Sequence, residues 1–89
     1  MLVIASVVVV LAAILDVSAN AWAILLLCIG TVLGVELVNS ALETLADRVE
    51  PEQDPAIRDT KDIAAAAVLV VSIIAAMTGI VVLWPYVLD

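Results

Sequence analysis

Two apolar stretches long enough to cross a lipid bilayer constrain the fold of this chain more than any other feature. They cover residues 21–46 and 63–88, and a bilayer requires about 20 largely apolar residues of helix. Hydrophobic residues make up 66% of the 89-residue chain, whereas soluble domains contain about half. Backbone N–H and C=O groups in the hydrocarbon region find no water, so they must pair with one another, and a helix pairs them within one segment. We therefore predict an all-α integral membrane protein.

A shorter apolar stretch precedes them, over residues 2–15. As a helix it would extend about 21 Å, against a hydrocarbon core of about 30 Å. Such a helix either enters the membrane from an interfacial segment or is preceded by further residues. Alternatively, this stretch is a cleavable signal peptide. The chain contains no linker, low-complexity tail or internal repeat. We predict one membrane domain over residues 1–89 with three transmembrane helices, at about 2–15, 19–49 and 60–86, and a loop at about 50–59.

The basic residues predict the orientation of the chain. Arg48, Arg58 and Lys61 all fall between the second and third apolar stretches. Because cytoplasmic loops carry an excess of Lys and Arg, this loop is expected in the cytoplasm. The N-terminus is then cytoplasmic, the C-terminus lies outside, and residues 16–20 form a short outer hairpin.

Prolines set the expected ends of the helices around that loop. Pro51 and Pro55 each disfavour helix at the preceding residue, so the second helix should end near Val49. Either Asp59 or Thr60 can cap the third helix, because both side chains accept hydrogen bonds from backbone N–H groups.

Charge and composition exclude several functional classes. The net charge of −7 argues against nucleic acid as a partner, because phosphate binding needs clustered Lys and Arg. One Cys and no His leave no zinc ligand set and no disulfide within the chain. The three glycines match neither a phosphate-binding loop nor a dinucleotide fingerprint.

One stripe of the second apolar helix carries polar groups. At about 100° per residue, Glu43 and Asp47 lie about 20° to either side of Glu36. Asn39 lies about 60° away. A carboxylate in a membrane span costs several kcal/mol unless it faces a bundle interior, so such groups usually serve a function. We expect these side chains to face one site, with a polar clamp between helices as the structural alternative.

The residue types in the stripe suit phosphoryl transfer to a membrane alcohol. Glu36, the deepest, suits a general base that acts on a lipid hydroxyl. Glu43 suits a hard cation such as Mg²⁺ that also bridges nucleotide phosphates. A lysine at a helix N-terminus is unfavourable for the helix dipole, which suggests that Lys61 meets a phosphate or a carboxylate. A lysine that snorkels to the cytoplasmic interface is the alternative.

Two other classes of function fit some of these features. A non-catalytic assembly subunit would use the polar stripe to bind a partner helix or a lipid headgroup. A small ion or proton carrier would use Glu36 within an oligomer. Three helices enclose little volume, so oligomerisation is expected in each case.

Two motifs resemble the signature of the prokaryotic diacylglycerol kinase and undecaprenol kinase family. They are Glu36-x-x-Asn39-Ser-Ala-x-Glu43-x-x-x-Asp47 and, after the loop, Lys61-Asp62-Ile-Ala-Ala-Ala-Ala-Val-Leu. The resemblance covers roughly residues 11–86, and the pair of motifs is more specific than either alone.

The resemblance implies a homotrimer of three-helix subunits in a bacterial or archaeal cell membrane, with MgATP used in composite active sites at the cytoplasmic face. By position, it implies Glu36 as the catalytic base and Glu43 as the metal ligand. Asn39 would support the site, and Ala65 stands where some members have a lipid-contacting serine. The residues implied near the nucleotide are Glu43, Asp47, Glu52, Gln53, Asp54, Lys61 and Asp62.

The sequence departs from the family pattern in two places. Members normally begin with an amphipathic surface helix that carries a second metal-binding glutamate, and this sequence begins inside the first apolar stretch. A separate partner chain is one way to supply that helix. The loop reads Glu52-Gln53-Asp54 where a Glu-Tyr-His run is common. The acceptor stays open between undecaprenol and diacylglycerol.

Overall fold

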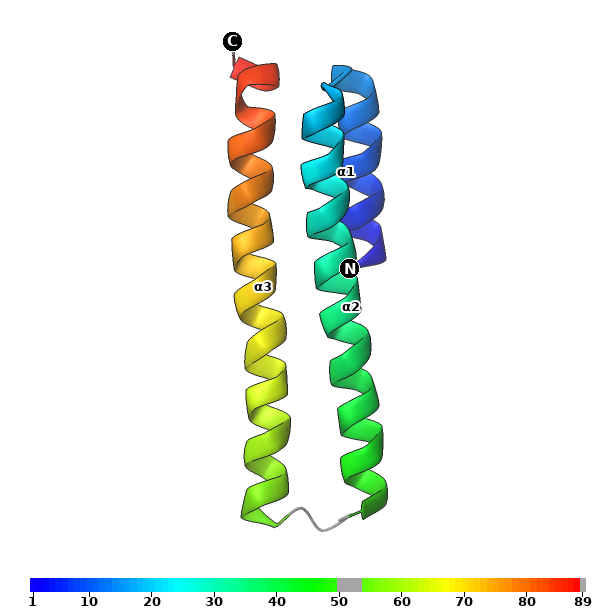
Figure 1. Ribbon diagram of the computed structural model, residues 1–89, viewed down its shortest axis with the longest axis vertical. Coiled ribbons are helices and arrows are strands. Elements are labelled where there is room, and N and C mark those ends of the chain that lie inside the picture. Colours follow the sequence, from blue (N-terminus) through cyan, green and yellow to red (C-terminus); the bar gives the residue numbers. More distant parts are fainter. Residues whose placement is uncertain (50–53, 89) are drawn as a thin grey trace.

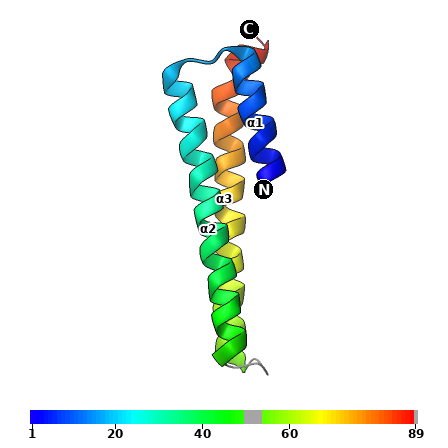
Figure 2. The same ribbon diagram turned by 90° about the vertical axis from the view of Figure 1, so that its right-hand side faces the viewer.

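The computed structural model of the chain describes residues 1–49 and 54–88. All elements in this described part are helices, as the sequence predicts: α1 (Leu2–Leu15), α2 (Ala19–Val49) and α3 (Pro55–Leu88). They form a rod of 53 × 18 × 16 Å. α2 and α3 run antiparallel over its whole length, and α1 lies beside one end of this pair (Figures 1 and 2).

α2 and α3 are both long and apolar enough to cross a membrane, whereas α1 is a shorter apolar helix. Their 31 and 34 residues correspond to about 46 and 51 Å at the usual helical rise. Both helices therefore exceed the roughly 30 Å of bilayer hydrocarbon. Large apolar side chains such as Leu27, Ile63 and Val81 are about 70% exposed. A surface of this kind fits lipid or other apolar helices, because an extended apolar patch is unfavourable in water.

A seam of mostly apolar side chains joins α2 to α3. Along each helix the buried and half-buried positions of this seam are spaced alternately by three and four residues, a pattern that keeps one face of a helix against a neighbour. The seam residues of α2 are Ala21, Leu25, Cys28, Val32, Val35, Asn39, Leu42 and Ala46. Those of α3 are Ile57, Lys61, Ala64, Val68, Val71, Ala75, Thr78 and Val82.

Residues 16–18 connect α1 to α2, within the hairpin predicted for residues 16–20. Asp16 adopts the left-handed conformation (φ 52°, ψ 53°), and its N–H donates to carbonyl oxygens of the last turn of α1. Ser18 then caps α2, because its Oγ accepts from the N–H of Ala21 at 3.2 Å. Tyr86 ties this hairpin to the end of α3, where its hydroxyl accepts from the Ser18 N–H at 3.1 Å.

The third helix begins at Pro55, five residues before the expected start, and the prediction that Asp59 or Thr60 caps it is wrong. Asp54 is the cap: its Oδ1 accepts from the N–H of Ile57 at 2.9 Å. The reason is that proline is favoured at the first helical position, where its missing N–H has no partner to lose. Lys61 consequently lies in the second turn of α3, away from the helix N-terminus.

Candidate functional site

The structure divides the polar stripe of α2 between two environments. Glu36 and Asn39 are half-buried, whereas Glu43 and Asp47 are exposed. Asn39 belongs to the seam against α3, and Glu36 follows the seam residue Val35, so its side chain lies at the edge of the seam. The sequence analysis expects all four groups to face one site, whereas the structure places two of them in a half-buried environment and two in an exposed one.

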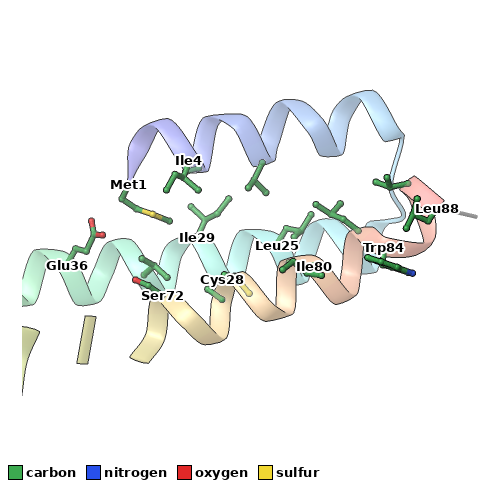
Figure 3. A pocket seen from close by; sticks show the side chains of 18 residues that line it. Met1, Ile4, Leu25, Cys28, Ile29, Glu36, Ser72, Ile80, Trp84 and Leu88 are labelled. Carbon is green, nitrogen blue, oxygen red and sulfur yellow. The ribbon is translucent and has the colours of Figure 1, made fainter. Parts of the chain in front are cut away.

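Glu36 lies at one end of an apolar groove between the three helices. The groove has a volume of about 820 Å³, and Glu36 is the only charged side chain among the described residues that line it. Ser72 of α3 lines the same end, whereas Trp84 and Leu88 line the opposite end (Figure 3). A carboxylate thus meets a hydrocarbon-lined cavity, the arrangement that an alcohol with a long apolar chain requires.

A second hollow meets the first at Glu36. Its volume is about 570 Å³, and Leu33, Leu37 and Ser40 of α2 line it together with the first residues of the chain. Glu36 borders both hollows. Its carboxylate is therefore reachable from more than one side of α2.

Asn39 carries a buried polar atom without a partner. Its Oδ1 is buried and accepts no hydrogen bond from the described residues. Leaving such an atom unpaired costs about 1–3 kcal/mol. A native residue that carries this penalty calls for an explanation. One explanation is that a ligand or a water molecule donates a hydrogen bond to this oxygen.

Lys61 of α3 and Asp47 of α2 form an ion pair near the end of the seam that is predicted to be cytoplasmic. The Lys61 Nζ lies 2.8 Å from the Asp47 Oδ1, and the side chains are 16% and 57% exposed. The sequence analysis expects Lys61 to meet a phosphate or a carboxylate, and here it meets a carboxylate. Asp47 lies about 16 Å from Glu36 along the helix axis, so the structure does not bring Lys61 to Glu36.

The ion pair relates the heights of residues on α2 and α3 to within about one helical turn, because the lysine side chain is long and the Ser18–Tyr86 contact implies a register shifted by four residues. Counting from it, each step back along α2 matches one step forward along α3 because the helices are antiparallel. To within about one turn, Glu43 then lies near the height of Ala65, and Glu36 near that of Ser72. Glu43 and Ala65 are both exposed, so this level of the helix pair is open.

Two further predicted residues, Asp54 and Asp62, lie toward the end of the rod near the loop. Asp62 is exposed on α3, and Asp54 is exposed and caps that helix. Glu52 and Gln53 lie outside the described residues. The structure therefore gathers Glu36 and Asn39 in one region and Asp47 and Lys61 in another, with Glu43 between them along α2.

The acidic residues bear on whether Mg²⁺ could bind here. In the part of the chain that the structure describes, no three acidic or cysteine side chains cluster around a possible metal position. An Mg²⁺ ion that accompanies a nucleotide needs only one or two carboxylates, because phosphate oxygens and water supply its other ligands. The exposed carboxylate of Glu43 fits that requirement.

Ser72 is the site residue that sequence reasoning missed. It stands in the apolar run Val68-Leu-Val-Val-Ser72-Ile-Ile-Ala-Ala, where hydropathy alone does not show which way one hydroxyl points. The available signal was its spacing: it follows Ala65 by seven residues, which returns a helix to nearly the same face.

Comparisons with known proteins give a consistent family assignment. Residues 1–83 match the family model described as prokaryotic diacylglycerol kinase. The chain is 37% identical over 78 residues to the diacylglycerol kinase of Escherichia coli, which covers 88% of this chain and 64% of that protein. It is 33% identical over 70 residues to the undecaprenol kinase of Bacillus subtilis, covering 79% of this chain and 57% of the relative.

A third relative, the diacylglycerol kinase of Pseudomonas aeruginosa, is 39% identical over 74 residues. These residues cover 83% of this chain and 56% of the relative. The chain thus spans somewhat less than two thirds of the length of these curated relatives. No solved structure gives a significant match.

Proposed function

Because the chain belongs to the prokaryotic diacylglycerol kinase family, we propose that it transfers the γ-phosphate of ATP to a membrane lipid alcohol. The observation that carries this proposal is the position of Glu36 at the end of the apolar groove. A lipid chain fills such a groove by the hydrophobic effect, and its hydroxyl then lies beside a carboxylate. Undecaprenol and diacylglycerol are the two acceptors that the named relatives offer.

Glu36 acts as the general base in this proposal. Its carboxylate accepts the proton of the lipid hydroxyl while the lipid oxygen forms a bond to the γ-phosphorus. The bond between that phosphorus and the β–γ bridging oxygen breaks, and ADP leaves. Positioning and charge neutralisation account for most of the catalysis in such transfers.

The nucleotide lies along α2 toward the loop. Glu43 would hold Mg²⁺, which neutralises charge on the phosphates when it is bound. Lys61 reaches a phosphate by turning from Asp47 toward the level of Glu43, about 6 Å away along the helix axis. Asp62, exposed on the next position of α3, lies near the same phosphates.

We also propose the membrane arrangement. The loop and the nucleotide end are cytoplasmic, because all three basic residues lie near that end of the rod. Three copies associate through the apolar surfaces that the single chain exposes.

Transfer of labelled phosphate from ATP tests the proposal directly. The purified chain in mixed micelles is given Mg²⁺, labelled ATP and either undecaprenol or diacylglycerol. Glu36→Gln should abolish transfer, because the amide cannot accept the proton. Asp16→Asn is the matched control, since it removes a carboxylate at the opposite end of the rod and asparagine tolerates the left-handed conformation of that position.

Transfer to one lipid that depends on Glu36 and not on Asp16 supports the proposal and names the acceptor. A folded chain that transfers phosphate to neither lipid contradicts it and favours a non-catalytic assembly subunit.

A further inference from the structure

We propose that Ser72 positions the lipid hydroxyl opposite Glu36, by donating a hydrogen bond to the hydroxyl oxygen. This inference rests on the proposed function, because it names a second contact within the same lipid site. Ser72 and Glu36 come from facing helices and line the same end of the groove (Figure 3). Among the described residues, no other serine or threonine lines this groove.

The seam places these two side chains on the same side of the helix pair. Glu36 follows the seam residue Val35, and Ser72 follows the seam residue Val71. In an antiparallel pair, the residue that follows a facing position turns toward the same side on both helices. Glu36 and Ser72 also lie within about one helical turn of the same height, as the Lys61–Asp47 and Ser18–Tyr86 contacts indicate.

The hydroxyl of Ser72 is available for a ligand. Two hydroxyls on α2 and α3 bond to their own backbone: Thr31 Oγ1 donates to the Leu27 carbonyl at 2.7 Å, and Thr60 Oγ1 to the Ala56 carbonyl at 2.9 Å. Ser72 is not one of these, and neither are Ser40, Thr44 and Thr78. The Ser72 hydroxyl makes no hydrogen bond to the described residues, and its side chain is only half-buried.

An alcohol bound at this place needs both a donor and an acceptor. An ionised carboxylate only accepts hydrogen bonds, so Glu36 can take the proton of the alcohol but cannot hold its oxygen. A serine hydroxyl supplies the missing donor. The pair therefore recognises a hydroxyl at the end of an apolar chain and discriminates against a hydrocarbon of the same length.

A binding experiment tests this role without turnover. Trp84 lies at the opposite end of the groove from Ser72, so a long-chain alcohol brominated at its far end should quench its fluorescence. The measurement uses a Trp22→Phe background, in which Trp84 is the remaining tryptophan. A bromoalkane of equal length measures the apolar contribution alone.

We expect Ser72→Ala to weaken binding of the bromo-alcohol about three- to tenfold, the effect of one lost neutral hydrogen bond. Binding of the bromoalkane should not change. Ser72→Thr keeps a hydroxyl and should restore most of the affinity. Thr31→Val is the matched control, because it removes a hydroxyl that bonds to its own helix. Equal alcohol affinity in the wild-type chain and in Ser72→Ala, or a wild-type chain that prefers the alkane, overturns the inference.

A kinetic measurement separates this inference from the proposed function. In the kinase assay, Ser72→Ala should raise the KM for the lipid by the same factor and leave the KM for ATP unchanged. A general structural role would alter both. A wild-type chain that transfers no phosphate but binds the alcohol in a Ser72-dependent way contradicts the proposed function and supports the inference about Ser72.

Discussion

The ion pair between Asp47 and Lys61 is expected to stabilise the contact between α2 and α3 by a measurable but modest amount. The two charged atoms are 2.8 Å apart, and Lys61 is much less exposed than Asp47. Exposed ion pairs contribute about 0–1 kcal/mol. Because Lys61 is largely withdrawn from solvent, we expect a coupling free energy near the upper end, about 1 kcal/mol.

A double-mutant cycle isolates this coupling. Asp47→Asn removes the negative charge and keeps the shape of the side chain, and Lys61→Met keeps most of the apolar stem. The free energy of unfolding of the wild type, both single variants and the double variant gives the pairwise term. Unfolding is followed by circular dichroism in mixed micelles, at low salt and again at 1 M salt. The coupling should fall at 1 M salt, where the Debye length is about 3 Å.

A coupling indistinguishable from zero at low salt would refute the reasoning from the structure. Exchanging the two charges, with Asp47→Lys and Lys61→Asp together, then separates stability from nucleotide binding. The exchanged pair should recover stability because the attraction is preserved. It should not recover the affinity for ATP, because our proposal requires a cation on α3 at that position.

Three further predictions follow from individual contacts. Asn39→Leu should raise the free energy of unfolding by about 1 kcal/mol, because it removes a buried unpaired oxygen, and thermal unfolding measures this effect. The same substitution should lower phosphate transfer in the kinase assay. Asp54→Ala should cost about 1 kcal/mol through loss of the cap on α3, and Asp54→Ser should not, as chemical denaturation would show. Tyr86→Phe should cost up to about 1 kcal/mol and speed amide exchange at Ser18, because the tyrosine hydroxyl is the acceptor for that N–H.

The class of fold was predictable from the sequence because the apolar stretches leave few alternatives to helices. The ranges expected for the first two helices coincide with α1 and α2. The start of α3 was wrong because Pro55 was interpreted as part of a loop, although Asp followed by Pro is a common way to begin a helix. Lys61 does meet a carboxylate, but the reason given for that expectation, a position at the helix N-terminus, is wrong because α3 begins at Pro55. Its choice of Asp47 depends on how the two helices pair.

The candidate site was predictable only where one helix determines it. The spacing of Glu36 and Glu43 follows from helical geometry alone, and the structure keeps both on the same side of α2. Which residues of α3 face them depends on the pairing of two helices, and no pattern within either helix specifies it. That is why Ala65 was identified through a resemblance and Ser72 was missed.

The seam explains how an apolar helix pair can hold polar groups at a fixed separation. Three residues of the proposed site each follow a seam residue: Glu36 follows Val35, Glu43 follows Leu42, and Ser72 follows Val71. Packing in the seam therefore fixes their register, while their own side chains stay at its edge and avoid the full penalty of burial. A residue inserted into α2 between Glu36 and Glu43 would rotate the two carboxylates apart by about 100°. The apolar spacing of the seam is thus as much a requirement of the proposed chemistry as the carboxylates themselves.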